Sequence, residues 1–102
     1  RLWQAAILGF AGMSIRADGL FFDPHLPLRW QSLRFPVEYR GARLRVTVRQ
    51  VPLSISVKVE SGEKARVGLV DGEVRELLAG REYLCSSNDS GWGGWEEQKT
   101  ET

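Results

Sequence analysis

The most constraining feature of the sequence is the alternation of apolar and polar side chains between residues 33 and 59. Successive side chains of a β-strand point to opposite faces of its sheet, so the pattern predicts strands that each have one apolar face. Such strands must stack that face on a second layer, which favours two packed sheets. The residues predicted to point inward are Leu33, Phe35, Val37, Leu44, Val46, Ile55 and Val57.

Short turns separate the alternating segments. Ala17-Asp18-Gly19 and Asp71-Gly72 are typical of tight hairpins, and Arg40-Gly41 and Ser61-Gly62 mark further turns. About seven short strands are predicted, and because no connection is long enough for a crossover we expect antiparallel pairing. The predicted fold class for residues 14–85 is all-β, a small antiparallel, jelly-roll-like β-sandwich preceded by one apolar helix.

The N-terminal end breaks the alternation. Residues 1–13 carry apolar side chains at helical spacing and end near Gly12, which predicts a helix that is apolar on most sides. Such a helix is normally covered by other elements, and one small sandwich covers only one face of it. We therefore expect elements outside this chain, on its N-terminal side, to cover Trp3, Ile7 and Phe10. The alternative is a helix that packs on the sandwich with one face and leaves its other faces exposed.

The C-terminal end is rich in serine, glycine and charge. Residues 86–102 are therefore predicted to be a flexible tail, with Trp92 and Trp95 as its only anchors.

Composition excludes several classes of protein. The chain has 102 residues, enough for one domain, and its net charge of +1 favours neither nucleic acid nor an anionic membrane. No apolar run reaches the ~20 residues that span a bilayer. Cys85 is the single cysteine, which excludes an internal disulfide and fits a reducing, cytoplasmic location. The chain begins at Arg1 rather than Met, which indicates the boundary of a fragment or a processed end.

No catalytic, cofactor-binding or metal-binding residues assemble from the sequence. His25 has only Asp23 beside it, which is too few ligands for zinc. The carboxylates lie in turns and on polar strand faces, and no two of them stand out as a glycosidase pair. Leu84 and Ser86 offer Cys85 no base, so we interpret Cys85 as a buried bystander thiol.

Two surface features each allow two interpretations. Arginines gather near the middle of the sequence, but the neighbouring aromatics fall on the opposite strand face, so a solvated or interdomain face is favoured over a nucleic-acid surface. The arginines are Arg34, Arg40, Arg43, Arg45 and Arg49.

Trp30 is either a sugar-stacking platform or a side chain that fills the edge of the core, and the second is the commoner case.

Three segments resemble a known family. Residues 2–13 (LWQAAILGFAGM) resemble the last barrel helix of glycoside hydrolase family 65, typically T-W-Q-A, two hydrophobic residues, x-G-F-G-G and a hydrophobic residue. Residues 18–35, with D-G-L-x-F-D-P-x-L-P-x-x-W-x-x-L-x-F, look like the start of its C-terminal β-domain, and residues 39–46 are similar to the next hairpin. The resemblance covers roughly residues 2–59, with Ala11 where the family usually has glycine. It implies that residues 1–13 are the terminal helix of an upstream (α/α)₆ catalytic barrel, with Trp3, Ile7 and Phe10 packed against barrel helices.

The resemblance implies a role within a larger enzyme. The family includes maltose, trehalose and kojibiose phosphorylases and some hydrolases, built from an N-terminal β-sandwich, an (α/α)₆ barrel and a small C-terminal sandwich. A barrel glutamate acts as general acid, and inorganic phosphate, the co-substrate, attacks from the opposite face of the sugar. Both sites lie upstream of the matching piece, so no catalytic, cofactor-binding or metal residue is carried over.

We therefore expect a C-terminal accessory domain that braces the catalytic barrel of an inverting α-glucoside phosphorylase or hydrolase and is inactive alone. The expected partners are that barrel, the disaccharide substrate of the parent enzyme and, through the apolar helix, a second copy in a homodimer. The resemblance leaves open which disaccharide is used and whether phosphate or water is the acceptor. The alternative is a free-standing carbohydrate-binding or protein-interaction β-sandwich module.

Overall fold

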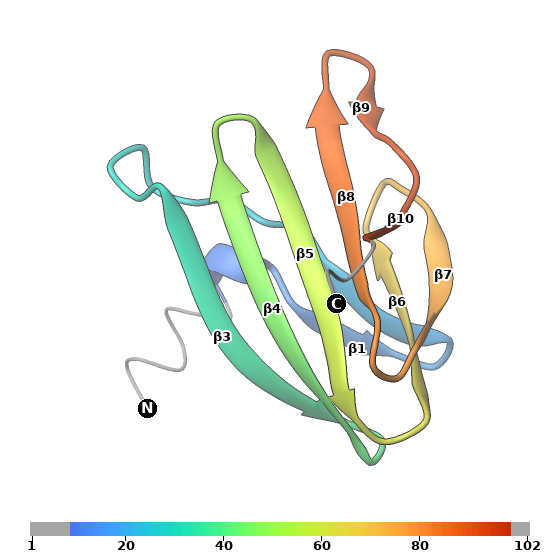
Figure 1. Cartoon of the computed structure of the whole chain (residues 1–102). Helices are drawn as coiled ribbons and strands as arrows, with labels where there is room; N and C mark the ends of the chain where they lie inside the picture. The colour runs from blue at the N-terminus through green and yellow to red at the C-terminus, as the bar shows by residue number, and fades with distance from the viewer. Residues whose placement is uncertain (1–8, 99–102) are drawn as a thin grey trace.

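The computed structural model describes residues 9–98 as two layers of β-strands, which confirms the predicted sandwich (Figure 1). Most of the predicted N-terminal helix lies outside the described residues, and only residues 9–11 are seen in a helical turn. No helix among residues 9–98 is long and apolar enough to cross a membrane.

The larger sheet forms the front layer in Figure 1 and is antiparallel, in the order β10-β8-β5-β4-β3. Its central hairpin turns at Arg40 and Gly41, whose φ values of 50° and 81° suit a tight turn between paired strands. Its strands are β3 (Ser32–Tyr39), β4 (Ala42–Gln50), β5 (Leu53–Ser61), β8 (Glu82–Asn88) and β10 (Glu96–Gln98), and β9 (Gly91–Trp92) pairs with β8.

The smaller sheet has the order β1-β2-β6-β7. The expectation of wholly antiparallel pairing is wrong here, because β2 and β6 run parallel, with Leu20 opposite Val67. Short turns force antiparallel pairing only between strands that follow one another directly in the sequence. β2 and β6 are separated by β3, β4 and β5, and this long segment provides the crossover connection that a parallel pair needs. The strands of this sheet are β1 (Ser14–Arg16), β2 (Gly19–Phe22), β6 (Lys64–Leu69) and β7 (Val74–Leu78).

One apolar core fills the space between the two sheets. Of the residues predicted to point inward, all are buried except Leu33, which is only partly buried at the start of β3. Val46 and Val57 are fully buried and lie opposite each other on β4 and β5. The smaller sheet contributes Leu20, Val67 and the other apolar residues of β2 and β6, so each layer covers the apolar face of the other.

The structure differs from the expected flexible tail at residues 86–98. Trp95 is only 4% exposed, and its backbone and indole N–H groups donate to the Glu73 carboxylate (2.7 Å) and the Glu73 carbonyl (3.1 Å). Arg75 donates to the Trp95 carbonyl at 2.8 Å. These partners lie on or beside β7, far away in the sequence, so the local composition of the C-terminal segment could not reveal them. Residues 99–102 lie outside the described residues.

Replacing Val46 with Asp should abolish the cooperative unfolding transition. A buried, unpaired carboxylate costs several kcal/mol, against a total stability of roughly 5–15 kcal/mol for a domain of this kind. Arg34→Asp is the matched control, because Arg34 lies on the exposed face of the neighbouring strand. Circular dichroism melts of both variants measure the effect, and an unchanged melt for Val46→Asp would contradict the assigned core.

Replacing Trp95 with Ala should lower the free energy of unfolding by about 3–5 kcal/mol, as is typical for a buried aromatic side chain. The loss should be smaller for Trp30→Ala, since Trp30 is 40% exposed. Urea denaturation followed by circular dichroism gives both values. Equal losses, or no loss at Trp95, would mean that residues 86–98 are not anchored as described.

Candidate functional site

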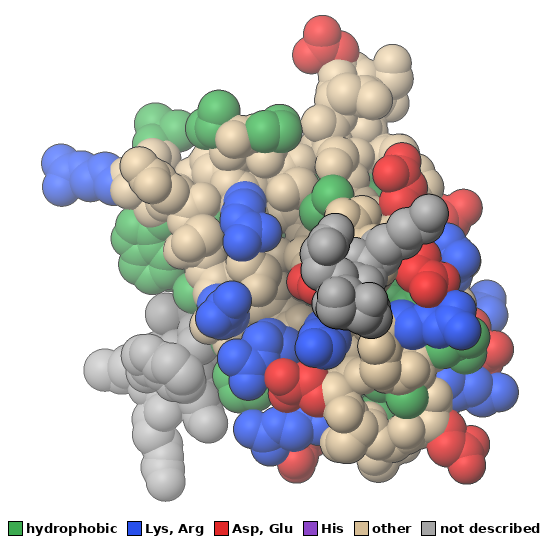
Figure 2. Space-filling view, viewed as in Figure 1, with side chains coloured by type: hydrophobic (Ala, Val, Ile, Leu, Met, Phe, Trp, Pro, Cys, Tyr) green, Lys and Arg blue, Asp and Glu red, His purple; other side chains and the backbone are tan. Residues whose placement is uncertain are grey.

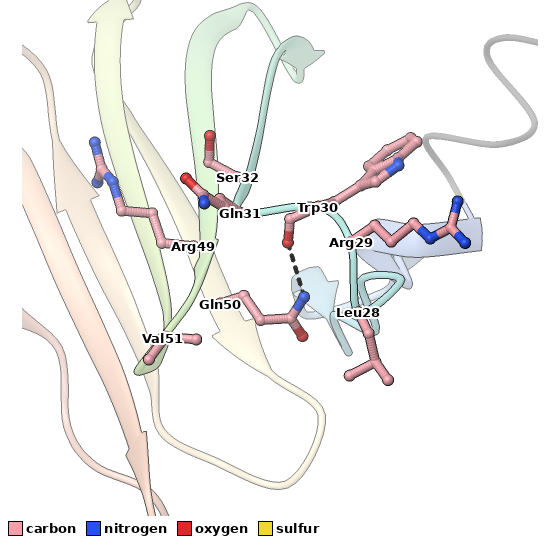
Figure 3. A pocket seen from close by; sticks show the side chains of 8 residues that line it. All are labelled: Leu28, Arg29, Trp30, Gln31, Ser32, Arg49, Gln50 and Val51. Atoms are coloured by element: carbon pink, nitrogen blue, oxygen red, sulfur yellow. Dashed lines mark hydrogen bonds between the residues drawn. The ribbon is translucent and has the colours of Figure 1, made fainter.

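The candidate site is an open groove of about 470 Å³ at one end of the sandwich. It lies between the loop that leads into β3 and the tip of the β4–β5 hairpin (Figure 3). None of the side chains that line it carries a carboxylate, an imidazole or a thiol. The lining residues are Leu28, Arg29, Trp30, Gln31, Ser32, Arg49, Gln50 and Val51.

Gln50, at the end of β4, holds the groove in shape. Its side-chain amide donates to the carbonyl oxygen of Trp30 at 2.8 Å (Figure 3). The same amide also donates to the carbonyl oxygen of Pro27 at 2.8 Å. Its backbone N–H donates to Gln31 at 3.0 Å. Three hydrogen bonds from one residue of a regular strand therefore fix the loop of residues 27–31. The shape of the groove is set by these bonds.

The polypeptide enters the sandwich beside this groove. Asp23 N–H donates to the carbonyls of Ala11 and Gly12 at 3.2 and 3.1 Å, and His25 N–H donates to that of Phe10 at 2.7 Å. Ala11 is fully buried in the core. Gly12 has φ +59°, and a Cβ atom there would lie 2.1 Å from the Asp23 carbonyl oxygen, so only glycine fits. Residues 10–12, which lead into the sandwich, are therefore held in one position on it, and we call them the fixed joint.

Phe10 packs against this chain as well. Its ring meets the edge of Trp30 at a centroid distance of 4.8 Å and an interplanar angle of 73°, and it contacts the core. Phe10 therefore has partners within this chain, and its packing against helices outside the chain stays a prediction. Trp3 and Ile7 lie outside the described residues. Trp30 is partly covered by Phe10, and 40% of the residue stays exposed.

Three apolar side chains remain open to solvent at the groove. Leu28 is 95% exposed and Val51 is 93% exposed, and with Trp30 they form what we call the end surface. Figure 2 shows hydrophobic side chains gathered along the upper left of the molecule, over the ends of β3 and β4. Leu28 and Val51 could not be recognised from the sequence, because the sequence of a loop does not show whether a neighbouring strand covers its apolar side chains.

The histidine and the arginines do not assemble into a site. His25 is exposed and lies 3.2 Å from Asp23, and no group of three or more potential ligands among residues 9–98 could hold a metal ion. Glu60 contacts Arg45 at 2.9 Å and Arg43 at 3.6 Å, so part of the arginine row is neutralised by its own sheet. The remaining members diverge: Arg40 donates to Ala17 at the opposite end of the sandwich, and Arg49 lines the groove.

Cys85 is fully buried on β8, and its thiol donates to the carbonyl of Gly93 at 3.2 Å. Burial, with the nearby carboxylates of Glu73 and Glu96, raises the pKa of the Cys85 thiol from 9.0 to about 11. A buried thiol that stays protonated at neutral pH is not a nucleophile. The geometry therefore agrees with the interpretation of Cys85 as a bystander in the core.

The raised pKa of Cys85 gives stability a defined dependence on alkaline pH. The folded thiol holds its proton above the pH at which the unfolded thiol ionises, so this contribution is complete below about pH 9 and is lost between about pH 9 and 11. Over that window the protein should lose about 2–3 kcal/mol more than the Cys85→Ala variant. Urea denaturation at a series of pH values measures the difference, and parallel pH profiles would contradict the assignment.

Comparison with known proteins identifies the family. The model of the glycosyl hydrolase family 65 C-terminal domain matches residues 13–76. Kojibiose phosphorylase from Halothermothrix orenii is 38% identical over 87 residues, covering 85% of this chain and 10% of that protein. Alpha,alpha-trehalose phosphorylase from Geobacillus stearothermophilus is 44% identical over 46 residues, covering 45% of this chain and 6% of that protein.

A solved structure shares the fold. A chain provisionally described as a kojibiose phosphorylase from the human microbiome has a TM-score of 0.64 and 17% identity, and the match covers 98% of this chain and 12% of that one. The present chain thus spans about a tenth or less of the proteins it matches. On the family match and the relatives' identity, the chain belongs to the C-terminal domain family of glycosyl hydrolase family 65.

Proposed function

We propose that this chain is the non-catalytic C-terminal module of a larger inverting α-glucoside phosphorylase or hydrolase, and that it braces the helical catalytic barrel of that enzyme. The names of its relatives, which include kojibiose, trehalose and maltose phosphorylases, support this assignment. In the parent enzyme, inorganic phosphate would be the co-substrate and a disaccharide the substrate. The lone thiol Cys85 supports a cytoplasmic location.

The observation that carries the proposal is the fixed joint at residues 10–12. Backbone hydrogen bonds from Asp23 and His25 hold this segment on the sandwich, and Ala11 is part of the core. A module that only tethers a ligand works well on a flexible linker, whereas a brace must keep a constant orientation to the domain it supports. The joint supports the second role.

The groove offers no group for glycosidic bond cleavage. That reaction needs a carboxylic acid to protonate the leaving oxygen, and no carboxylate lines the groove. Other acidic side chains have structural partners: Glu60 pairs with Arg45 and Arg43, and Glu73 accepts from Trp95. These contacts support a module whose parent enzyme carries out its chemistry elsewhere.

A carbohydrate-binding module is the second candidate, and one observation favours it. The exposed part of Trp30 offers a surface for sugar stacking, and Arg29, Gln31 and Arg49 beside it could donate hydrogen bonds to hydroxyl groups. The groove, however, presents one exposed aromatic ring, and that ring is partly covered by Phe10.

The purified chain should release neither glucose nor glucose 1-phosphate from kojibiose, trehalose or maltose, with or without phosphate, because no general acid lines its groove. The full-length protein that contains the chain should turn over one of these sugars, and deleting residues 13–102 from it should lower its melting temperature. Coupled assays for glucose and glucose 1-phosphate, with calorimetry, measure both effects. Turnover that copurifies with the isolated chain would overturn the non-catalytic role.

Titrating the isolated chain with the same sugars separates the two candidates. A bracing module should show no saturable change in tryptophan fluorescence. A saturable change that Trp30→Ala removes, and Trp92→Ala does not, would favour the carbohydrate-binding module.

A further inference from the structure

We infer that the end surface formed by Leu28, Trp30 and Val51 is the face that docks on the catalytic domain preceding residue 9 in the parent enzyme. This inference rests on the proposed function, because it requires such a domain. It goes further by assigning the contact to one end of the sandwich and to three named side chains.

The exposure of these side chains is the first argument. Leu28 and Val51 are 95% and 93% exposed, and they lie across one groove from each other (Figure 3). Scattered apolar residues are common on protein surfaces, but apolar side chains grouped on a rigid frame mark a contact surface. The frame here is rigid because Gln50 bonds to both Pro27 and Trp30.

The path of the chain is the second argument and identifies the occupant. The Phe10 and Trp30 rings meet edge to face, so the polypeptide that precedes the sandwich reaches it at the edge of the end surface. The matching family model is that of a C-terminal domain, and the matched region is 10% of the kojibiose phosphorylase from Halothermothrix orenii. The remainder of such a protein lies mostly upstream, and Phe10, which leads into the fixed joint at Gly12, contacts Trp30 of the end surface.

Charge refines the expected partner surface. Arg29 and Arg49 line the groove, and no acidic side chain lines it with them. The occupant should therefore present apolar side chains to Leu28 and Val51, with carboxylates or backbone carbonyl oxygens at the edge of the contact to meet the two guanidinium groups.

The test uses the full-length protein that contains this chain. The double variant Leu28→Asp/Val51→Asp should uncouple the module, so that a single calorimetric transition separates into two or its midpoint falls by several degrees. Ile15→Asp is the matched control, because Ile15 is 66% exposed but lies on β1, away from the groove. The milder pair Leu28→Ser/Val51→Ser should give a smaller shift in the same direction. Melts unchanged from wild type, or lowered equally by Ile15→Asp, would overturn the inference.

Two further measurements separate this inference from the proposed function. If deleting residues 13–102 destabilises the full-length protein and the Leu28/Val51 variants do not, the module braces the enzyme through another face, and only the docking assignment fails. If the deletion has no effect, the proposed bracing role fails as well. Sedimentation tests a second copy as the occupant: dissociation of a dimer by Leu28→Asp/Val51→Asp, with the domains still coupled in the melt, would overturn docking on the catalytic domain.

Discussion

The two sheets exclude water from each other, and every other feature of the domain depends on that contact. Val46 and Val57 on the larger sheet have no solvent exposure, and they share one core with Leu20, Phe22 and Val67 of the smaller sheet. A domain of this size buries only about two-thirds of its unfolded surface, so it depends on one continuous core. Ala11 belongs to that core, which ties the entry of the polypeptide to the stability of the sandwich.

The sequence predicted the features that depend on local pattern. The alternation through Phe35, Val46 and Val57 identified strands and their buried faces, because side-chain direction follows directly from the period of the strand. The four buried residues of β2 show no alternation, because Phe21 is also covered, by Arg16 and the backbone of β6. Its parallel pairing with β6 is a property of topology, and no residue near β2 encodes it.

The candidate site was harder to predict from the sequence, because it is defined by apolar side chains that no neighbouring element covers. Trp30 was recognised as notable, but its neighbours across the groove come from the β4–β5 hairpin. Trp95 posed the reverse problem, since a tryptophan among serines and glycines looks exposed until Glu73 and Arg75 are placed beside it. The resemblance identified the family, and the exposed groove residues are the basis of the docking face that we infer.

The parallel pair of β2 and β6 also has a consequence for synthesis on the ribosome. Hairpins β3–β4 and β4–β5 can close as soon as they emerge, whereas β2 has no partner on its inner side until β6 follows about forty residues later. The smaller sheet therefore cannot cover the larger one until β6 and β7 have been made, and the larger sheet itself is completed last, by β8 and β10. Until β6 and β7 emerge, the smaller sheet cannot cover the apolar face of β3, β4 and β5, and apolar surface exposed in this way on an incomplete chain is prone to aggregation.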